Sequence, residues 1–416
     1  MKIQVTTKTI DDASKALEGV AKKTPLQYNK RLSEQFGAII YFKREDLQDV
    51  RSYKIRGAYT MMHSLSVKEK ERGVVCASAG NHAQGVAMSA SLLKVRAAIF
   101  MPLSTPLQKI NKVKQFGGSW IDVQFVGQTY DESYAAAQAF GEEKGMVFVH
   151  AFDDPRTISG QGTVAKEIVE QHKGTIDYVF CPVGGGGLIS GMGIYLKEKM
   201  PRIKIIGVEP KGAPAMRHSL DQKRIVTLKH IDTFVDGAAM HRVGELSYHI
   251  TAKIADKVVL ADEGKICVMM IDLYQSEGIV TEPAGALAIS ALDQYAKEIK
   301  GKTIVCILSG GNNDILRYPE IMEKSLIYKE LKHYFLVQFA QRPGQLRAFL
   351  DNALGPTDDI VRFEYVKHNS REKGPALVGI ELADKRDLKP LLDKMDTLQL
   401  RYTKITVDDP LYSFLL

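Results

Sequence analysis

The chain has 416 residues, of which 45% are hydrophobic and 25% charged, and its net charge is +7. These values are ordinary for a folded globular protein, and the length suggests two or three domains of roughly 150 residues. Acidic and basic residues alternate, as in residues 68–72, which favours a solvated helix face over a nucleic-acid patch. Neither a run of about 18 apolar residues nor a signal-peptide core is present. We therefore expect a cytoplasmic protein that binds neither nucleic acid nor membranes.

The cysteines are few and widely spaced. Cys76, Cys181 and Cys306 lie in apolar runs, and Cys267 is the fourth. No C-x-x-C pair and no metal-ligand spacing is present. The pattern predicts small buried side chains in a reducing compartment rather than nucleophiles, and we expect no metal site.

Short runs rich in valine, isoleucine and aromatic residues alternate with helical segments along most of the chain. Such runs are typical of strands buried on both faces of a parallel sheet, so the pattern predicts an α/β fold. For one helix, Thr105 is expected to cap the start, Pro106 to occupy the first position and Gly117 to mark the end. The expected strands are residues 38–42, 73–77, 97–101, 178–183, 203–208 and 303–308.

Three of these expected strands lead directly into polar or glycine-rich segments. They are residues 78–82 (SAGNH), 184–188 (GGGGL) and 309–312 (SGGN), and Lys54 lies upstream in SYKIRGA. Open α/β sheets bind ligands at the carboxyl ends of their strands. The sequence therefore predicts one site that combines Lys54 with the three segments.

The residue types in these segments match the needs of pyridoxal phosphate (PLP). Lys54 can form an imine, and burial lowers the pKa of a lysine toward that of a useful base. Glycines followed by a helix that starts at Leu188 can present backbone N–H groups to a phosphate, although a bare glycine run could also be a flexible loop. The amide of Asn81 can bind the ring hydroxyl. The expected phosphate-binding residues are Gly184, Gly185, Gly186, Gly187 and Leu188.

The order of these motifs resembles the fold-type II PLP enzymes, and within them the biosynthetic threonine dehydratases, over nearly the whole chain. The resemblance implies two open, twisted α/β subdomains with parallel sheets. It places Tyr53 against the ring face, where Phe is commoner, and Ser309 opposite the ring nitrogen. A serine does not require a protonated nitrogen, which favours β-elimination over transamination. The expected substrate-binding residues are Ser78, Ala79, Gly80, Asn81 and His82.

Other positions refine the resemblance. Serine racemases have a serine where this chain has Ala79, so racemisation is expected to be poor. Glu209 resembles the start of the racemases' metal site, but the later aspartate is missing. Arg56 could supply charge near Lys54 or only stabilise its loop. His82 is implied to be structural rather than an acid–base group, and the segment that starts at Glu282 resembles an active-site segment without an assigned role.

The composition changes after Tyr318. Residues 319–332 are expected to form a linking helix, and residues 333–416 show the β-α-β-β-α-β order of a ferredoxin-like domain. This part resembles one ACT-like amino-acid-sensing domain. It is expected either to bind a branched-chain amino-acid effector or only to assemble a homodimer or homotetramer. Its strands are expected at residues 334–339, 360–365, 376–382 and 401–405, and its helices at 345–354 and 386–395.

The whole chain is thus expected to comprise a catalytic region, residues 1–318, with a small subdomain of roughly residues 55–150 inserted, and a regulatory domain. The resemblance implies conversion of L-threonine to 2-oxobutanoate and ammonia, the first step of isoleucine biosynthesis, with feedback by isoleucine. The enzymatic alternatives are a serine dehydratase, a hydroxyaspartate dehydratase or a threonine synthase. A non-catalytic amino-acid-binding protein is the alternative from another class.

Overall fold

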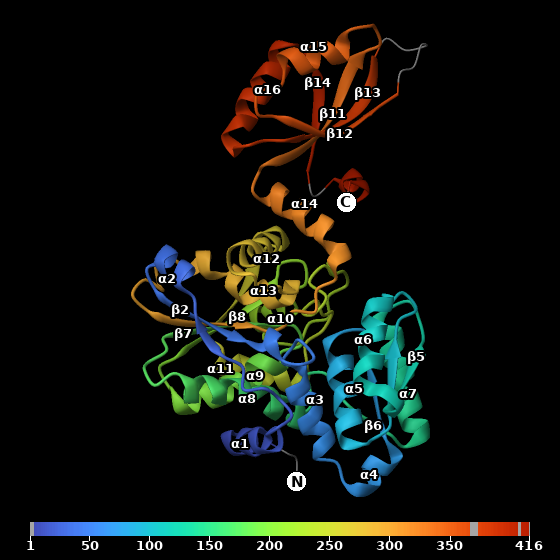
Figure 1. Cartoon of the computed structure of the whole chain (residues 1–416), viewed down its shortest axis with the longest axis vertical. Coiled ribbons are helices and arrows are strands. Elements are labelled where there is room, and N and C mark those ends of the chain that lie inside the picture. Colours follow the sequence, from blue (N-terminus) through green and yellow to red (C-terminus); the bar gives the residue numbers. More distant parts are fainter. Residues whose placement is uncertain (1–3, 367–372, 407–408, 416) are drawn as a thin grey trace. The chain divides into compact units, whose positions relative to one another are not determined.

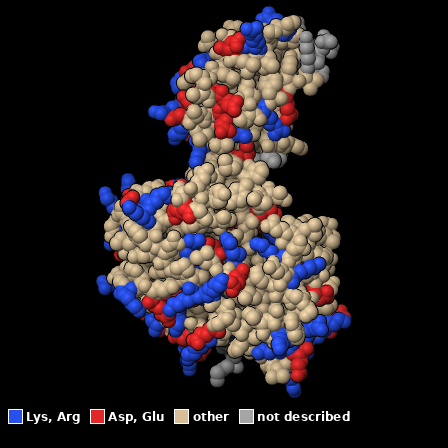
Figure 2. Space-filling view, viewed as in Figure 1, with Lys and Arg blue, Asp and Glu red and all other residues tan. Residues whose placement is uncertain are grey.

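The computed structural model describes residues 4–366, 373–406 and 409–415. Residue contacts divide the chain into two compact units, Met1–Asp314 and Ile315–Leu416, and each is described by itself (Figure 1). On the face drawn in Figure 2, basic and acidic side chains are interspersed rather than gathered by sign. Every helix among the described residues is too short or too polar to cross a membrane.

The larger sheet of the first unit has six strands in the order β1-β2-β10-β7-β8-β9. β1 pairs antiparallel with β2, and the other neighbouring pairs are parallel. Because β10 lies directly beside β7, the segments that follow these two strands meet at one edge of the sheet. The strands are β1 (Leu26–Tyr28), β2 (Ile39–Arg44), β7 (Tyr178–Pro182), β8 (Lys204–Pro210), β9 (Lys257–Ala261) and β10 (Thr303–Leu308).

Helices pack on this sheet around a core that includes Val179, Ile189 and Val305. Glycine permits the close contact between α8 and α9, because a Cβ added to Gly191 would lie 2.2 Å from the carbonyl oxygen of Ile158. The helices are α1 (Thr7–Ala16), α2 (Lys30–Phe36), α3 (Lys54–His63), α8 (Pro155–Gln171), α9 (Gly187–Lys199), α10 (Ala215–Asp221), α11 (Glu245–Ile254), α12 (Glu263–Glu277) and α13 (Pro283–Ser290).

A smaller subdomain of the first unit has a parallel four-stranded sheet in the order β5-β4-β3-β6 (Figure 1). Its core includes Val74, Ile99 and Val113. Together the two sheets confirm the predicted α/β class. The strands are β3 (Val74–Ala77), β4 (Ala97–Met101), β5 (Ile121–Phe125) and β6 (Val147–Phe148), and the helices are α4 (Val67–Arg72), α5 (Asn81–Leu93), α6 (Leu107–Gly117) and α7 (Tyr130–Lys144).

The start of α6 differs from the prediction. Pro106 is the N-cap residue, with φ −59° and ψ 138°, so the helix begins one residue later, at Leu107. The hydroxyl of Thr105 donates to the carbonyl oxygen of Pro102 at 2.7 Å and caps no helix N–H group. The prediction that Thr105 caps this helix was therefore wrong, because its hydroxyl closes the preceding turn instead.

All four cysteines are buried in the first unit, as the sequence predicts. Cys76, Cys181 and Cys306 lie on the central strands β3, β7 and β10, and Cys267 lies on α12. Burial raises the thiol pKa of the three strand cysteines. They are therefore protonated and inert packing residues at neutral pH.

The second unit has one antiparallel sheet in the order β12-β13-β11-β14. This is the strand order of a ferredoxin-like fold, so the predicted fold class is confirmed. Phe349 on α15 and Leu391 on α16 pack on Phe335 and Val378 of the sheet. The elements are α14 (Tyr318–Tyr328), β11 (Lys332–Ala340), α15 (Gln345–Asn352), β12 (Asp359–Tyr365), β13 (Lys373–Glu381), α16 (Leu388–Thr397) and β14 (Arg401–Ile405).

Helix α14, which lies where the linking helix is expected, packs within the second unit. Its Glu323 accepts hydrogen bonds from the hydroxyl of Tyr334 at 2.7 Å and from the amine of Lys332. Ile327 of the same helix packs against Tyr334 and Ile405. These contacts place the division between the units ahead of α14, at Asp314.

Candidate active site

One pocket of the first unit brings together residues from distant parts of the chain. It lies at the edge of the larger sheet where β7 and β10 end, since Pro182 is the last residue of β7 and Ser309 directly follows β10. Five of the residues predicted from the sequence take part in it. The lining residues are Tyr53, Lys54, Asn81, Pro182, Gly184, Gly237, Ala238, Glu282, Ala284 and Ser309.

Lys54 is the first residue of helix α3. Its Nζ atom donates to the carbonyl oxygen of Ala151 at 3.0 Å and lies 5.2 Å from the ring centroid of Tyr53. The backbone N–H group of Tyr53 donates to the carbonyl oxygen of Ser309 at 3.2 Å, which ties this turn to the end of β10. Burial lowers the pKa of Lys54 to about 8, although the nearby Glu282 opposes the shift. More of the amine is therefore neutral near pH 8 than in a free lysine, which suits imine formation and proton uptake.

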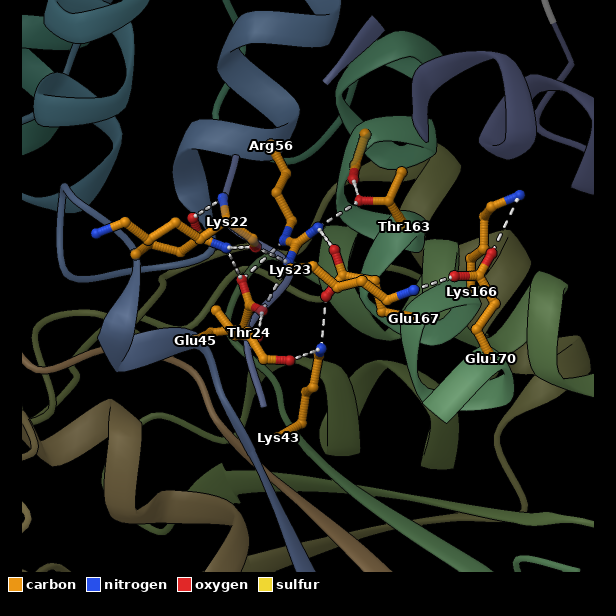
Figure 3. Close-up of polar contacts among 12 residues, drawn as sticks. Lys22, Lys23, Thr24, Lys43, Glu45, Arg56, Thr163, Lys166, Glu167 and Glu170 are labelled. Carbon is orange, nitrogen blue, oxygen red and sulfur yellow. Dashed lines mark hydrogen bonds and ion pairs between the residues drawn. The ribbon is translucent and has the colours of Figure 1, made fainter. Parts of the chain in front are cut away.

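Arg56, two residues further along α3, points into a buried cluster of charges (Figure 3). Its Nε and Nη2 atoms donate to the two carboxylate oxygens of Glu45, both at 2.8 Å, and Nη1 donates to Glu167 at 2.7 Å. Lys43 completes the cluster through Glu167 and the carbonyl oxygen of Thr24. Two cations thus balance two anions, and the guanidinium holds the first turn of α3 onto α8 and onto the turn that follows β2.

The glycine segment after β7 forms a cradle of backbone N–H groups. Among the described residues, the N–H groups of residues 184–188 donate to no acceptor. Gly186 has φ +95°, and α9 begins at the next residue. Side chains would not fit here, because a Cβ added to Gly185 would lie 2.3 Å from the ring of Phe152. Free N–H groups at a helix N-terminus bind anions, so the cradle fits the phosphate of PLP.

Asn81 is held from two sides in this pocket. Its Nδ2 atom donates to Glu282 at 2.6 Å, and its Oδ1 atom accepts from the Nδ2 atom of Asn312 at 2.7 Å. Asn312 in turn accepts from the amine of Lys112 at 3.0 Å. These bonds fix the plane of the Asn81 amide and leave one N–H bond available for a ring hydroxyl oxygen.

Glu282 is the residue of the pocket whose role the sequence left unassigned. It occupies the N-cap position of α13 without a capping hydrogen bond from its side chain, it is buried, and burial raises its pKa to about 7. The sequence placed Glu282 near the active site only because the Glu-Pro-Ala-Gly segment resembles an active-site segment of the family. Its contact with Asn81 depends on two loops that meet only in the folded protein, so the sequence contained no pattern for it.

Ser309 is buried, and its hydroxyl donates to the carbonyl oxygen of Ala284 at 3.1 Å. A hydroxyl can rotate, so it can either donate to a ring nitrogen or accept from a protonated one. The lysine, the cradle of N–H groups, the amide and this hydroxyl together fit the functional groups of PLP.

The SAGNH segment leads from β3 into α5. The hydroxyl of Ser78 accepts from the N–H group of Gly80 at 3.2 Å, and Ala79 lies between them. His82 is buried and does not line the pocket; its Nε2 atom lies 2.8 Å from the carbonyl oxygen of Val149. Burial, followed by the charge of Lys54, lowers its pKa to about 3. A neutral imidazole bound to the backbone is a structural element.

Two lining residues, Gly237 and Ala238, had no sequence signal. They lie in an irregular segment between α10 and α11, and a Cβ added to Gly184 would lie 2.9 Å from the Cα atom of Ala238. The segment is joined to the small subdomain through Asp236, which pairs with Lys109 of α6 at 2.7 Å. Backbone packing against Gly184 and the ion pair of the neighbouring Asp236 place these residues in the site.

Glu209 caps a helix. Its carboxylate oxygens accept from the N–H groups of Met216 and Arg217, at 2.7 and 2.8 Å, in the first turn of α10. Burial raises its pKa to about 8. Within the part of the chain that the structure describes, no three His, Cys, Asp or Glu residues gather in a metal-binding group.

Comparison with known proteins identifies two families along the chain. Residues 17–310 match the family described as pyridoxal-phosphate dependent enzyme. Residues 323–415 match the family described as C-terminal regulatory domain of threonine dehydratase.

Curated relatives and solved structures agree with these matches. The L-threonine dehydratase biosynthetic IlvA of Halalkalibacterium halodurans is 50% identical over 404 residues, which are 97% of each chain. The protein of the same name from Staphylococcus aureus is 49% identical and covers 100% of both chains.

Among solved structures, the processed form of threonine deaminase isoform 2 from Solanum lycopersicum is 39% identical, with a TM-score of 0.72 over 78% of this chain and 96% of that one. Maize serine racemase is 31% identical, with a TM-score of 0.72 over 78% of this chain and 99% of that one. The chain therefore belongs to the pyridoxal-phosphate-dependent enzyme family, and it carries the C-terminal regulatory domain of threonine dehydratases.

Proposed function

We propose that this chain is an L-threonine ammonia-lyase, which converts L-threonine to 2-oxobutanoate and ammonia in the first step of isoleucine biosynthesis. The observation that carries the proposal is the meeting of Lys54, Asn81, Gly184 and Ser309 in one pocket. Full-length similarity to proteins named biosynthetic L-threonine dehydratase supports the choice of substrate.

The proposed roles follow from the position of each group. PLP, when bound, supplies an electron-accepting ring that stabilises negative charge at the substrate Cα. Lys54 holds the cofactor covalently and, once free, takes the Cα proton with its amine. The N–H groups of residues 184–188 hold the phosphate. The amide of Asn81 binds the hydroxyl of the PLP ring and so orients the ring. Ser78 and the backbone N–H groups that follow it grip the substrate carboxylate. The hydroxyl group on Cβ takes up a proton and leaves as water, and hydrolysis of the resulting enamine gives 2-oxobutanoate and ammonia.

The direct test is a 2-oxo-acid assay on a panel of β-hydroxy amino acids. Threonine is expected to give the highest kcat/KM, with serine as the runner-up, because one methyl group contributes only about 1–3 kcal/mol of discrimination. A clear preference for serine or hydroxyaspartate would replace this proposal with the corresponding dehydratase. Absence of turnover for every member, in protein that binds PLP, would favour a non-catalytic amino-acid-binding role.

Replacing Ser309 with aspartate is expected to slow dehydration and to increase transamination. A carboxylate at this position would hold a proton on the ring nitrogen. The protonated ring would stabilise the negative charge at Cα more strongly, so the carbanion would live longer and transamination would compete with loss of the hydroxyl group. The ratio of 2-oxobutanoate to aminated cofactor measures the effect. Ser309→Asn is the matched control, because asparagine has the shape of aspartate without its charge. Equal product ratios in the wild type and Ser309→Asp would refute the electronic explanation.

We also propose that the second unit senses a branched-chain amino acid, with isoleucine as the feedback inhibitor, and that the protein is a cytoplasmic homodimer or homotetramer. The match to a regulatory domain of threonine dehydratase supports a regulatory role. An effector acts only if it binds one conformational or oligomeric state better than another.

A coupling of about 1–3 kcal/mol would change the apparent affinity for threonine by roughly 5- to 150-fold. Truncation after Asp314, where the contacts divide the chain, is expected to leave an active enzyme that ignores isoleucine. Threonine saturation curves with and without isoleucine, on both forms, measure the coupling. Equal inhibition of the full-length and truncated forms by isoleucine would place the effector site in the first unit. If isoleucine had no effect on the full chain, the second unit would have only a role in assembling the oligomer.

A further inference from the structure

Gln161 is a buried polar residue near the site that the proposed chemistry does not use. It lies within helix α8, and its side chain is fully buried. Its Nε2 atom donates to the carbonyl oxygen of Ala151 at 3.1 Å, the same oxygen that accepts from Lys54 at 3.0 Å. Two donors, one from α3 and one from α8, therefore share a single acceptor.

Ala151 lies in the irregular segment between β6 and α8. No helix or sheet bond fixes the direction of its carbonyl group, so this direction depends on the donors that meet it. The Gln161 amide is anchored on a rigid helix and supplies a fixed donor. The resting position of the Lys54 amine is thereby tied to helix α8 through one carbonyl oxygen.

The other end of the Gln161 amide lies against the glycine cradle. A Cβ added to Gly187 would be 2.5 Å from the Oε1 atom of Gln161. This oxygen is buried and has no hydrogen-bond partner among the described residues. Leaving a buried acceptor unpaired costs about 1–3 kcal/mol, a cost that a methionine of similar length would avoid. Packing alone therefore does not account for a glutamine at this position.

We propose that Gln161 is a positioning residue that sets the place of the free Lys54 amine relative to the glycine cradle. The cofactor must reach Lys54 with its carbonyl carbon and the cradle with its phosphate at the same time, so the separation of these two groups matters. Gln161 spans the gap between them. The inference rests on the proposed role of Lys54 and adds a residue that touches neither substrate nor cofactor.

The test is the capture of PLP by the cofactor-free protein, without threonine. The rate at which the visible absorbance band of the covalently bound cofactor appears, followed against pH, reports the fraction of neutral Lys54. In the wild type this rate is expected to rise with pH through about 8. The other titratable groups that face the amine are Glu282, His82 and His150. These groups are the same in every variant, so a difference in the midpoint of the pH profile of the capture rate is caused by the substitution.

Gln161→Met is expected to slow capture and to weaken PLP binding, each by about 10-fold, with thermal stability unchanged or higher. Gln161→Glu places a carboxylate beside the amine and is expected to move the midpoint of the capture profile to higher pH. Gln171→Met is the matched control, because Gln171 ends the same helix and donates to the carbonyl oxygen of Thr24 at 2.8 Å. Its capture rate and midpoint are expected to equal those of the wild type.

Wild-type capture rate, PLP affinity and midpoint in Gln161→Met would overturn the proposal. If Gln161→Met does not fold, Gln161→Glu decides, and an unshifted midpoint there would also overturn it. A wild-type protein that captures PLP normally but does not turn over threonine would refute the proposed function and leave the role of Gln161 standing.

Discussion

Replacing Lys54 with alanine is expected to lower threonine turnover by several orders of magnitude and to remove the visible absorbance band of the PLP-loaded protein. The variant loses both the covalent link to the cofactor and the amine that takes the Cα proton, and a general base alone contributes about 10²- to 10⁴-fold. Initial rates of 2-oxobutanoate formation and an absorbance spectrum measure the two losses separately.

The fold is expected to survive this change. Among the described residues the amine of Lys54 makes one hydrogen bond, to Ala151, and the first turn of α3 remains held through Arg56. Unchanged circular dichroism and a melting temperature close to that of the wild type would exclude unfolding as the cause. Lys68→Ala, on the exposed face of α4, is the control for a lysine lost elsewhere. Turnover near the wild-type rate in Lys54→Ala would rule out this residue as the base.

Replacing Arg56 with methionine is expected to reduce the free energy of unfolding of the first unit by about 3–5 kcal/mol, the usual cost of removing one partner from a buried ion pair. Glu45 and Glu167 would both lose their ion pair with Arg56, whereas the pair of Lys43 with Glu167 would remain. Chemical denaturation followed by the fluorescence of Trp120, the only tryptophan, measures the loss.

Arg156→Met is the matched control. Arg156 pairs with Asp154 on the partly exposed first turn of α8, where an ion pair contributes about 1 kcal/mol or less. An equal loss of unfolding free energy in the two variants would mean that burial does not strengthen the ion pairs of Arg56.

The buried cluster also has a predictable pH dependence. Burial has the largest single effect on the pKa of Glu45 and raises it. The charge and hydrogen bonds of Arg56, the charge of Lys43 and the hydrogen bond from Thr24 together outweigh burial, so the net pKa lies below the usual value of 4.5. The contribution of Glu45 is therefore complete above pH 4.5 and is lost as the pH falls below it. Acid destabilisation of the first unit in this range is expected to be smaller in Arg56→Met than in the wild type.

How far the fold can be predicted depends on the kind of strand. β7 and β10 are continuous apolar runs because both of their faces are covered, and such runs are visible in a single sequence. β5, with the sequence Ile-Asp-Val-Gln-Phe, and the two-residue β6 lie at the edges of the smaller sheet and were not predicted. Short edge strands are stabilised by pairing with a neighbour more than by their own composition.

The same distinction holds in the site. Lys54, Ser309 and the glycine segment were predicted because the chemistry restricts which residue types can occupy those positions. Glu282 and Ala238 were not assigned roles, because their importance comes from contacts across the fold. Thr105 shows how a local rule fails: a hydroxyl suited to cap a helix closes the turn before it.

The distribution of the cysteines has a practical consequence for following how this protein opens. All four thiols are buried in the first unit, and residues 315–416 contain none. A thiol reagent can therefore react only when the first unit opens, and the rate of labelling in native buffer reports the free energy of that opening. Cys76 samples the small subdomain, whereas Cys181 and Cys306 sample the large sheet. Mass spectrometry of the labelled peptides would show whether the two subdomains open together or one at a time, with no engineered probe.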